Sequence, residues 1–313
     1  MSQTTAVPGR IRAGAVRLGR RGSYRGTSRS GLLMAAPALL LVAVFTLYPF
    51  GQAIYESTRL TSPFFPPEYV GLENYRGVLT SDYFADAALT TLLFAAVAVP
   101  VMVVLAALLL NERFVGNTAL RAGMLLPWAI PASVSGLIWK WVFEDSYGAV
   151  NVGLYSLGIV DEYIEWLTTP NLARLAVVVV FVWSQLPLAT VLILAAIQAV
   201  PEDFYEAAAL DGAQAISRFW TITLPNIRPM LLIVALYELL MAITAFDITY
   251  SLTRGGPGTA TTMLTYFTWA ESFKMLDFGR GSALAIVIAL GSLVAILALL
   301  RAMPKDALLD DAR

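Results

Sequence analysis

The side chains that most often perform catalysis or bind metals are missing from this chain of 313 residues, which contains no Cys and no His. The lack of Cys excludes disulfides, thiolate nucleophiles and Cys-based metal sites. The lack of His removes the commonest proton shuttle and metal ligand. The sequence also contains no Gly-x-Ser-x-Gly nucleophile motif and no His-Glu-x-x-His zinc motif. We therefore predict no catalytic residue, no metal site and no cofactor in this chain, and we do not expect an enzyme.

The acidic residue with the most chemical significance is Glu238, which lies in the middle of an apolar stretch. An ionised carboxylate at the centre of a bilayer costs a few kcal/mol. Such residues usually face a water-filled cavity or a partner group. We therefore predict that Glu238 lines a passage for a polar solute, with a structural contact to another helix as the alternative.

The composition places these residues in a membrane. Of the 313 residues, 58% are hydrophobic and 14% are charged, whereas an ordinary globular domain carries roughly 25% charged residues. The mean hydropathy of +0.69 agrees. A helix needs about 20 mostly apolar residues to cross a bilayer. Six stretches qualify, namely Leu32–Ile54, Ala87–Leu110, Ala122–Phe143, Leu175–Ala199, Met230–Leu252 and Ser282–Leu300. The sequence therefore predicts an all-α membrane protein with six transmembrane helices.

Basic residues indicate how these helices are oriented, because cytoplasmic segments are enriched in Lys and Arg. The first thirty residues contain seven arginines and no acidic residue. Residues 1–30 are therefore predicted to be a disordered cytoplasmic tail that touches anionic lipid, and no nucleic-acid role is expected. A cleaved secretory signal is excluded, because the apolar run that follows is too long and lacks a small-residue cleavage site. Six crossings through a domain of residues 31–303 then place the C-terminal tail, residues 304–313, in the cytoplasm.

The segment of residues 200–225 is predicted to form two short helices on the cytoplasmic side. Pro201 ends one helix and begins the next, and Gly212 interrupts the run of helix formers that follows. A second short helix is expected to stop at Leu224-Pro225. Large aromatic side chains on a loop exposed to water indicate a surface for a partner. These side chains are Phe204, Phe219 and Trp220.

One spacing pattern runs through this segment: Glu-Ala-Ala, three residues, Gly, nine residues and Ile-x-Leu-Pro. It is filled by Glu206, Ala207, Ala208, Gly212, Ile222, Leu224 and Pro225. In this the segment resembles the cytoplasmic EAA loop of the binding-protein-dependent ABC transporter permeases. In that family the loop forms a coupling helix that docks into a cleft on the ATP-binding subunit, where its glutamate pairs with a basic residue. The resemblance therefore implies an ATPase-coupling role for these seven residues.

Further motifs resemble the sugar-permease branch of that family, of the maltose-transporter larger-permease type. They are Val70–Tyr75, Leu126–Pro131, Trp139–Trp141, Leu252–Pro257 and Asp277–Gly279. With them the resemblance covers nearly the whole chain between its two tails. It implies a multi-pass permease in a bacterial or archaeal cytoplasmic membrane that takes up a di- or oligosaccharide by alternating access. Import of glycerol-3-phosphate or a glycerophosphodiester is the alternative within the same class.

The resemblance also implies partners. A second permease subunit would complete a heterodimer, two ATP-binding subunits would hold ATP and Mg, and an extracytoplasmic solute-binding protein would deliver the substrate. ATP hydrolysis is then expected in the partners and not in this chain. An ion-coupled secondary carrier is the alternative from another class, but such carriers are usually built from inverted repeats. We see no internal repeat in the sequence.

Alignment of the fourth and fifth apolar stretches with this branch implies a substrate pathway. Its residues are Phe181, Ser184, Gln185, Leu188, Glu238, Met241, Ala242 and Ala245. Sugars need aromatic faces together with amides, hydroxyls or carboxylates, and this set offers all of them. Ala242 and Ala245 stand where the maltose-type site offers amides, so a maltose-like specificity is not implied.

Overall fold

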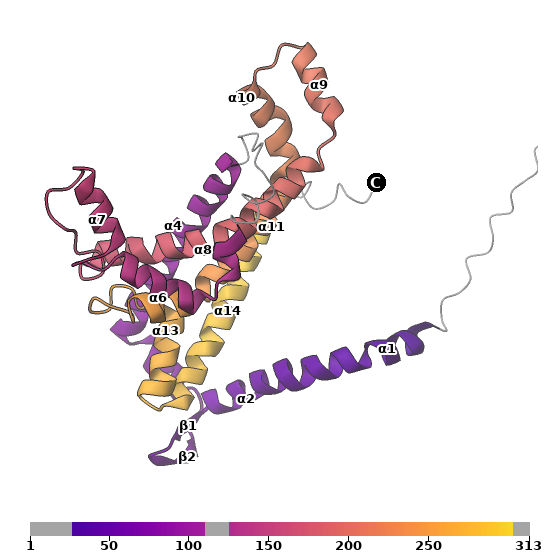
Figure 1. Cartoon of the computed structure of the whole chain (residues 1–313). Coiled ribbons are helices and arrows are strands. Elements are labelled where there is room, and N and C mark those ends of the chain that lie inside the picture. The colour runs from indigo at the N-terminus through magenta and orange to yellow at the C-terminus, as the bar shows by residue number, and fades with distance from the viewer. Residues whose placement is uncertain (1–26, 110–124, 303–313) are drawn as a thin grey trace, which may run out of the picture. The chain divides into compact units, whose positions relative to one another are not determined.

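The computed structural model describes residues 27–109 and 125–302, and helices form most of this length (Figure 1). Residues 1–26, 110–124 and 303–313 lie outside the described residues, so the predictions for the two tails stay predictions. Residues 27–30 of the predicted N-terminal tail already belong to the first helix. The chain divides at Gly51 into two units, and each is described by itself.

The first unit contains an apolar helix. It comprises α1 (Thr27–Val42), the π-helix η2 (Ala43–Leu47) and the first residues of α2 (Tyr48–Ser57), which continues into the second unit. From Leu33 to Gly51 no side chain is buried.

The second unit is built from helices and one small hairpin. Its helices are α3 (Glu73–Leu79), α4 (Asp82–Leu109), α6 (Ala132–Val142), α7 (Ala149–Ser156), α8 (Pro170–Gln198), α9 (Glu202–Leu210), α10 (Ala215–Arg218), η3 (Phe219–Thr223), α11 (Leu224–Ile243), α12 (Asp247–Leu252), α13 (Leu264–Trp269), η4 (Ala270–Lys274) and α14 (Phe278–Ala302). Strands β1 (Arg59–Ser62) and β2 (Phe65–Tyr69) pair antiparallel, with Arg59 opposite Tyr69. This hairpin is the exception to the predicted all-α fold.

Five helices of the described residues are long and apolar enough to cross a membrane. They are Leu33–Ser57, Asp82–Ala106, Pro170–Gln198, Ala215–Ile243 and Phe278–Arg301. The first, second, fourth and sixth predicted stretches coincide with four of them to within a few residues. The count of six spans and the cytoplasmic position of both termini stay predictions.

The third predicted stretch, Ala122–Phe143, is not one continuous helix in its described part. Residues 125–129 are helical, the helix breaks at Ile130, and α6 begins after Pro131. Proline disfavours a helical conformation at the residue before it and donates no backbone hydrogen bond, which accounts for a break here. The 11 residues of α6 span only about 16 Å, roughly half of the hydrocarbon core.

The fifth predicted stretch, Met230–Leu252, has the wrong bounds. The helix begins at Ala215 and ends at Ile243, and Asp247–Leu252 form the separate helix α12. The Thr265 hydroxyl donates a hydrogen bond to the Ala245 carbonyl at 2.8 Å. The chain therefore turns after Ile243, where a partner distant in sequence stabilises the non-helical backbone at Ala245.

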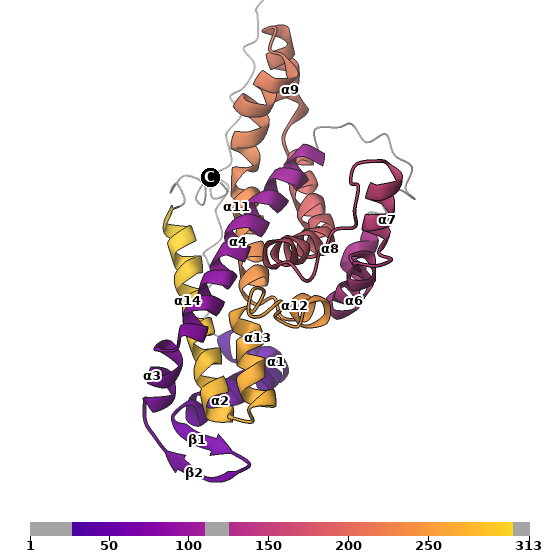
Figure 2. The same ribbon diagram turned by 90° about the vertical axis from the view of Figure 1, so that its left-hand side faces the viewer.

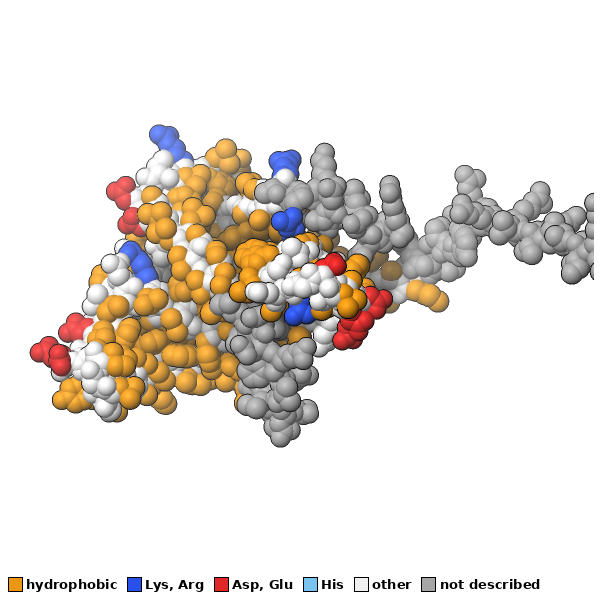
Figure 3. All heavy atoms as spheres, turned by 90° about the horizontal axis from the view of Figure 1, so that it is seen from above, with side chains coloured by type: hydrophobic (Ala, Val, Ile, Leu, Met, Phe, Trp, Pro, Cys, Tyr) orange, Lys and Arg blue, Asp and Glu red, His pale blue; other side chains and the backbone are white. Residues whose placement is uncertain are grey.

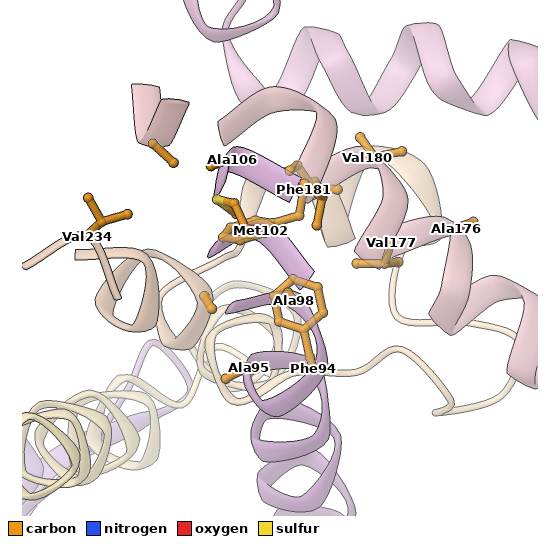
Figure 4. Close-up of a cluster of buried hydrophobic side chains, with 14 of the residues drawn as sticks. Phe94, Ala95, Ala98, Met102, Ala106, Ala176, Val177, Val180, Phe181 and Val234 are labelled. Carbon is orange, nitrogen blue, oxygen red and sulfur yellow. The ribbon is translucent and has the colours of Figure 1, made fainter. Parts of the chain in front are cut away.

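The core of the second unit lies where α4 meets α8 and α11 (Figure 4). The ring of Phe94 on α4 contacts the ring of Phe181 on α8 edge to face, with 5.1 Å between centroids. Met102 on α4 and Val234 on α11 are fully buried in the same cluster. These three helices are thus held together by apolar contact along their facing sides.

Helices α6 and α12 approach each other closely at Gly136. A Cβ atom added there would overlap the Ser251 hydroxyl and come within 3.3 Å of the Ile248 carbonyl oxygen. Ser251 cannot simply turn away, because its hydroxyl donates to the Asp247 carbonyl at 2.7 Å.

We therefore expect Gly136→Ala to lower the melting temperature of the purified protein, measured by thermal unfolding in detergent. Alanine would otherwise favour a helix by about 1 kcal/mol. Gly153→Ala on α7, where nothing lies within 4 Å of the added atom, is the matched control and should raise the melting temperature. An unchanged or higher value for Gly136→Ala would contradict the close crossing.

Candidate functional site

Helices α9 and α10 form a helical hairpin that projects at one end of the second unit, beyond α8 and α11 (Figures 1 and 2). Pro201 precedes α9 with extended backbone angles, φ −58° and ψ 135°, as its preference outside a helix requires. Glu202 and Asp203 occupy the first turn of α9, where the helix dipole favours anions. The predicted start of this helix is therefore confirmed.

Gly212 ends α9 in a Schellman motif. Its N–H donates to the Ala209 carbonyl at 3.1 Å, and the next N–H, of Ala213, reaches back to Ala208 at 2.9 Å. The motif needs a left-handed backbone at the first residue after the helix cap. That residue is Gly212, whose φ is +78°. The glycine of the EAA pattern therefore sets the point at which the chain reverses.

The second helix of the hairpin does not stop at Leu224-Pro225, so that prediction is wrong. Helix α10 passes through the π-helix η3 into α11, and Ala215–Ile243 form one continuous helix. The π turn widens the helix just before Pro225, and the N–H of Leu224 bonds to the Phe219 carbonyl five residues back. The wider turn accommodates the proline that would otherwise break the helix.

One hydrogen bond joins the two arms of the hairpin. The Tyr205 hydroxyl on α9 lies 3.0 Å from the Thr223 hydroxyl at the end of η3. Thr223 is buried, and its neighbours Ile222 and Leu224 are half-buried. These two residues of the EAA pattern therefore anchor the base of the hairpin.

The tip of the hairpin exposes apolar side chains around the EAA glutamate. No residue of α9 is buried, and Glu206, Ala207 and Gly212 are exposed. Two large apolar side chains of the hairpin are also exposed, Leu210 at the end of α9 by 90% and Trp220 in η3 by 62%. Figure 3, seen from above this end, shows hydrophobic side chains interspersed with charged ones on the exposed surface. This combination has the character of a docking surface for a protein partner.

Seven of the eight residues of the predicted pathway lie on α8 and α11, and Ala245 lies just beyond the end of α11, but several are buried in the core. Phe181 is packed on Phe94, and the Ser184 hydroxyl donates to the Phe181 carbonyl at 2.9 Å. Ala242 is fully buried. Those that are half-buried are Gln185, Leu188, Met241 and Ala245. None of the eight lines either of two cavities in this unit, so their role stays a prediction.

Glu238 is fully buried, and neither of its carboxyl oxygens has a hydrogen-bond partner among the described residues. It lies four residues after Val234 and four before Ala242, so all three project from one face of α11. Val234 and Ala242 belong to the apolar cluster with α4 and α8. Glu238 therefore occupies the centre of an apolar contact, where a polar group without a partner is costly.

A groove with mostly apolar walls and four hydroxyl groups lies on another side of α11, facing α13 and α14. Its volume is about 530 Å³. The hydroxyls belong to Thr244, Thr265, Thr268 and Ser292. Each threonine donates to a backbone carbonyl at 2.7–2.9 Å, whereas the buried Ser292 hydroxyl has no partner among the described residues. The groove thus offers the acceptor oxygens of three threonines among apolar side chains.

The sequence motifs assign none of Thr265, Thr268 and Ser292 to the pathway. The threonines follow the fifth span in a segment without a recognisable pattern, and Ser292 is a single polar residue within an apolar run. The only feature of the sequence that could have indicated these residues is a hydroxyl group within an apolar stretch. It is weak, because Ser and Thr in membrane helices often bond to their own backbone.

A second cavity, of about 340 Å³, lies between α4, α8 and the segment of residues 253–263. Its walls are mostly apolar, and Arg174 stands at its rim. Among residues 27–109 and 125–302, no group of three or more Cys, His, Asp or Glu side chains could hold a metal.

Comparisons with known proteins agree on one family. Residues 98–303 match the family described as the binding-protein-dependent transport system inner membrane component. The trehalose/maltose transport system permease protein MalF of Thermococcus litoralis is 39% identical over 83% of this chain and 88% of its own length. The sulfoquinovosyl glycerol transport system permease protein SmoG of Agrobacterium fabrum is 37% identical over 82% of this chain and 84% of its own length.

A more distant relative and a solved structure are consistent with this. The sn-glycerol-3-phosphate transport system permease protein UgpA of Agrobacterium fabrum is 31% identical over 82% of this chain and 88% of its own length. A chain of a bacterial ABC transporter involved in the import of the acidic polysaccharide alginate has the same fold, with a TM-score of 0.75 at 22% identity. That match covers 89% of this chain and 96% of the other.

The match spans well over half of the chain, and the relatives cover more than four fifths of it. The prediction of a multi-pass protein in the membrane is confirmed by the family and by the apolar helices. The chain belongs to the binding-protein-dependent ABC transporter permeases of the inner membrane, in their sugar-permease branch.

Proposed function

We propose that this chain imports a di- or oligosaccharide as one half of a permease heterodimer, driven by ATP hydrolysis in two separate subunits. The observation that carries the proposal is the hairpin of α9 and α10, which exposes Glu206 and an apolar tip. Its sequence fills the EAA pattern, and its position at one end of the helices suits contact with a soluble subunit.

The hairpin is connected to the core by a rigid element. Ala215–Ile243 is a continuous helix of 29 residues, about 43 Å long. The Tyr205–Thr223 bond fixes α9 to this helix. A displacement of α9 by an ATP-binding subunit would therefore move Glu238 and the contacts of α11 with α4 and α8. In alternating access, such a movement would separate these helices and expose the pathway residues that are now buried.

We propose that a saccharide binds in the groove beside α11, with the C–H faces of the sugar against its mostly apolar walls. A groove of about 530 Å³ lies within the range of small-molecule sites, roughly 300–1,000 Å³. Its hydroxyls match the hydroxyl groups of a sugar, which donate and accept hydrogen bonds. The second permease would close its open side. The named substrates of the two relatives above 35% identity, trehalose or maltose and sulfoquinovosyl glycerol, support a glycoside.

Glycerol-3-phosphate is the second candidate, favoured by the similarity to the glycerol-3-phosphate permease. The two candidates differ in size and charge. Uptake by the reconstituted transporter, with its binding protein and a panel of disaccharides, glycosyl glycerols and glycerol phosphates, tests them. Saturable, ATP-dependent uptake of a saccharide supports the proposal. Uptake of glycerol-3-phosphate alone would favour the second candidate, and uptake driven by an ion gradient without ATP would refute both.

The role of the hairpin is tested by charge reversal within it. We expect Glu206→Lys to reduce substrate-stimulated ATP hydrolysis and uptake at least about tenfold, because reversing one member of a buried interfacial charge pair costs about 2–5 kcal/mol. Glu202→Lys in the first turn of the same helix is the matched control and should retain most activity. The double variant Glu206→Lys with Gly212→Pro should no longer bind the ATP-binding subunit, while the chain still inserts into the membrane. Normal uptake by the double variant would refute the assignment.

The role of Glu238 is tested by an apolar replacement. We expect Glu238→Leu to raise the melting temperature, since it removes an unpartnered polar group from an apolar contact. The same variant should lower substrate affinity or uptake, the combination expected where a functional residue reduces stability. Val234→Leu on the same face of α11 is the control for a change of packing alone. A rise in melting temperature with unchanged uptake kinetics would assign Glu238 a passive structural role.

A further inference from the structure

The cavity between α4 and α8 has two chemically different parts. Its apolar wall is formed by Leu93, Phe94 and Val97 of α4 together with Leu175 and Val178 of α8. Leu93 and Val97 are about half exposed, so this wall opens on the surface of the chain. The ring of Phe94 is drawn in Figure 4 beside α8. The cavity is therefore an apolar recess that a hydrocarbon group could enter from the side.

The polar part of the cavity is Arg174 with the residues that hold it. Its Nε donates to the Ala260 carbonyl at 2.9 Å, and its Nη1 donates to the Asn171 side-chain oxygen at 3.1 Å. A guanidinium has five N–H donors, so most of them remain available. The single ion pair among the described residues joins Arg280 and Glu271, and thus no described carboxylate neutralises Arg174. The cation is fixed in place and its charge is not compensated.

The position of Arg174 along α8 places this charge near the edge of the bilayer. Helix α8 has 29 residues, about 43 Å, whereas the hydrocarbon core is about 30 Å thick. The terminal turns of a spanning helix of this length therefore lie at or near the headgroup region, at a depth that its tilt sets. Arg174 is the fifth residue of α8, about 6 Å from its beginning. Val178 lies one turn deeper, so the cavity passes from a cation at headgroup depth to an apolar wall at acyl-chain depth.

We propose that this cavity binds a phospholipid, with its phosphate on Arg174 and the beginning of an acyl chain against the wall formed by α4 and α8. A phosphate oxygen satisfies the free guanidinium donors with charge-assisted hydrogen bonds. A saccharide is a poorer occupant, because a neutral molecule leaves the charge of Arg174 uncompensated. A free inorganic anion would leave the apolar recess unused. Basic pockets between transmembrane helices recognise lipid headgroups by this combination.

The bound lipid would also contact the core of the protein. Phe94 forms part of the cavity wall and at the same time packs on Phe181, a residue of the predicted pathway. An acyl chain in the cavity would pack against the face of Phe94 that lines the cavity, next to its contact with Phe181. The lipid site is thus adjacent to the region where α4 and α8 hold α11.

The test uses the complete transporter in nanodiscs that contain phosphatidylglycerol with a photoreactive group near the start of one acyl chain. After illumination, mass spectrometry locates the labelled peptides of this chain. We expect labelling of Leu93–Val97 and of α8 near Val178. Arg174→Gln should reduce this labelling about fivefold, the effect of one cation near a lipid phosphate, whereas Arg174→Lys should retain most of it.

Two further variants separate lipid binding from general effects of charge or folding. Arg76→Gln removes an exposed arginine on α3 and should leave the labelling unchanged. Val97→Trp fills the apolar recess without touching Arg174 and should lower the labelling. Equal labelling of Arg174→Gln and Arg76→Gln would overturn the proposal. Full protection by excess inorganic phosphate, or by a transported saccharide, would also overturn it, because the site would then hold a free anion or the substrate.

Discussion

Close contact among α4, α8 and α11 is the constraint on which the other features of this protein depend. The hydrophobic effect does not drive helices together in lipid, so their association relies on fitted surfaces and small side chains. Here the facing sides supply Ala98 and Ala242, both fully buried, between larger residues such as Phe94 and Phe181. These small residues let the helix backbones approach. The projecting hairpin, the buried carboxyl group and the cavity between α4 and α8 are positioned by these three helices.

Glu238 is the local exception to this contact. Every neighbour that the cluster provides on this face of α11 is apolar, and neither carboxyl oxygen has a described partner. Sequences conflict with their surroundings in this way chiefly at functional or strained sites. Under the proposed function the conflict is resolved when the helices separate, because water or substrate can then satisfy the carboxyl group. The contact of α11 with α4 and α8 would thus be stable in the closed state, and the buried carboxyl group would lower the cost of opening it.

The sequence predicted well those features that depend on local chemistry. Four apolar stretches coincide with membrane helices, and Pro201 and Gly212 mark both ends of α9 through their own backbone preferences. It predicted poorly where distant residues decide the outcome. The predicted fifth stretch runs on through residues 244–252, yet the chain turns there, and Thr265 bonds to Ala245. The continuity of α10 with α11 was missed because a π turn accommodates Pro225.

The candidate site divides in the same way. The EAA residues could be identified because their spacing along one short segment carries the pattern, and that segment forms the predicted hairpin. The groove beside α11 could not be identified from the sequence. Its hydroxyl residues Thr244, Thr265 and Ser292 come from three separate segments, and no local pattern reveals that they lie close together. The role proposed for Arg174 could not be predicted from the sequence either, because its contacts with Asn171 and Ala260 form only in the folded chain.

The π-helix η3 has a geometric consequence for the helix that contains it. A π turn holds one residue more than an α turn, so the side chains before and after it are out of phase by about 100°. If the wide turn migrated along the helix, the residues that it passed would rotate by that angle about the axis while the helix stayed unbroken. The junction at Phe219–Thr223 could therefore convert a lateral push at the hairpin into a twist of the apolar helix beyond it.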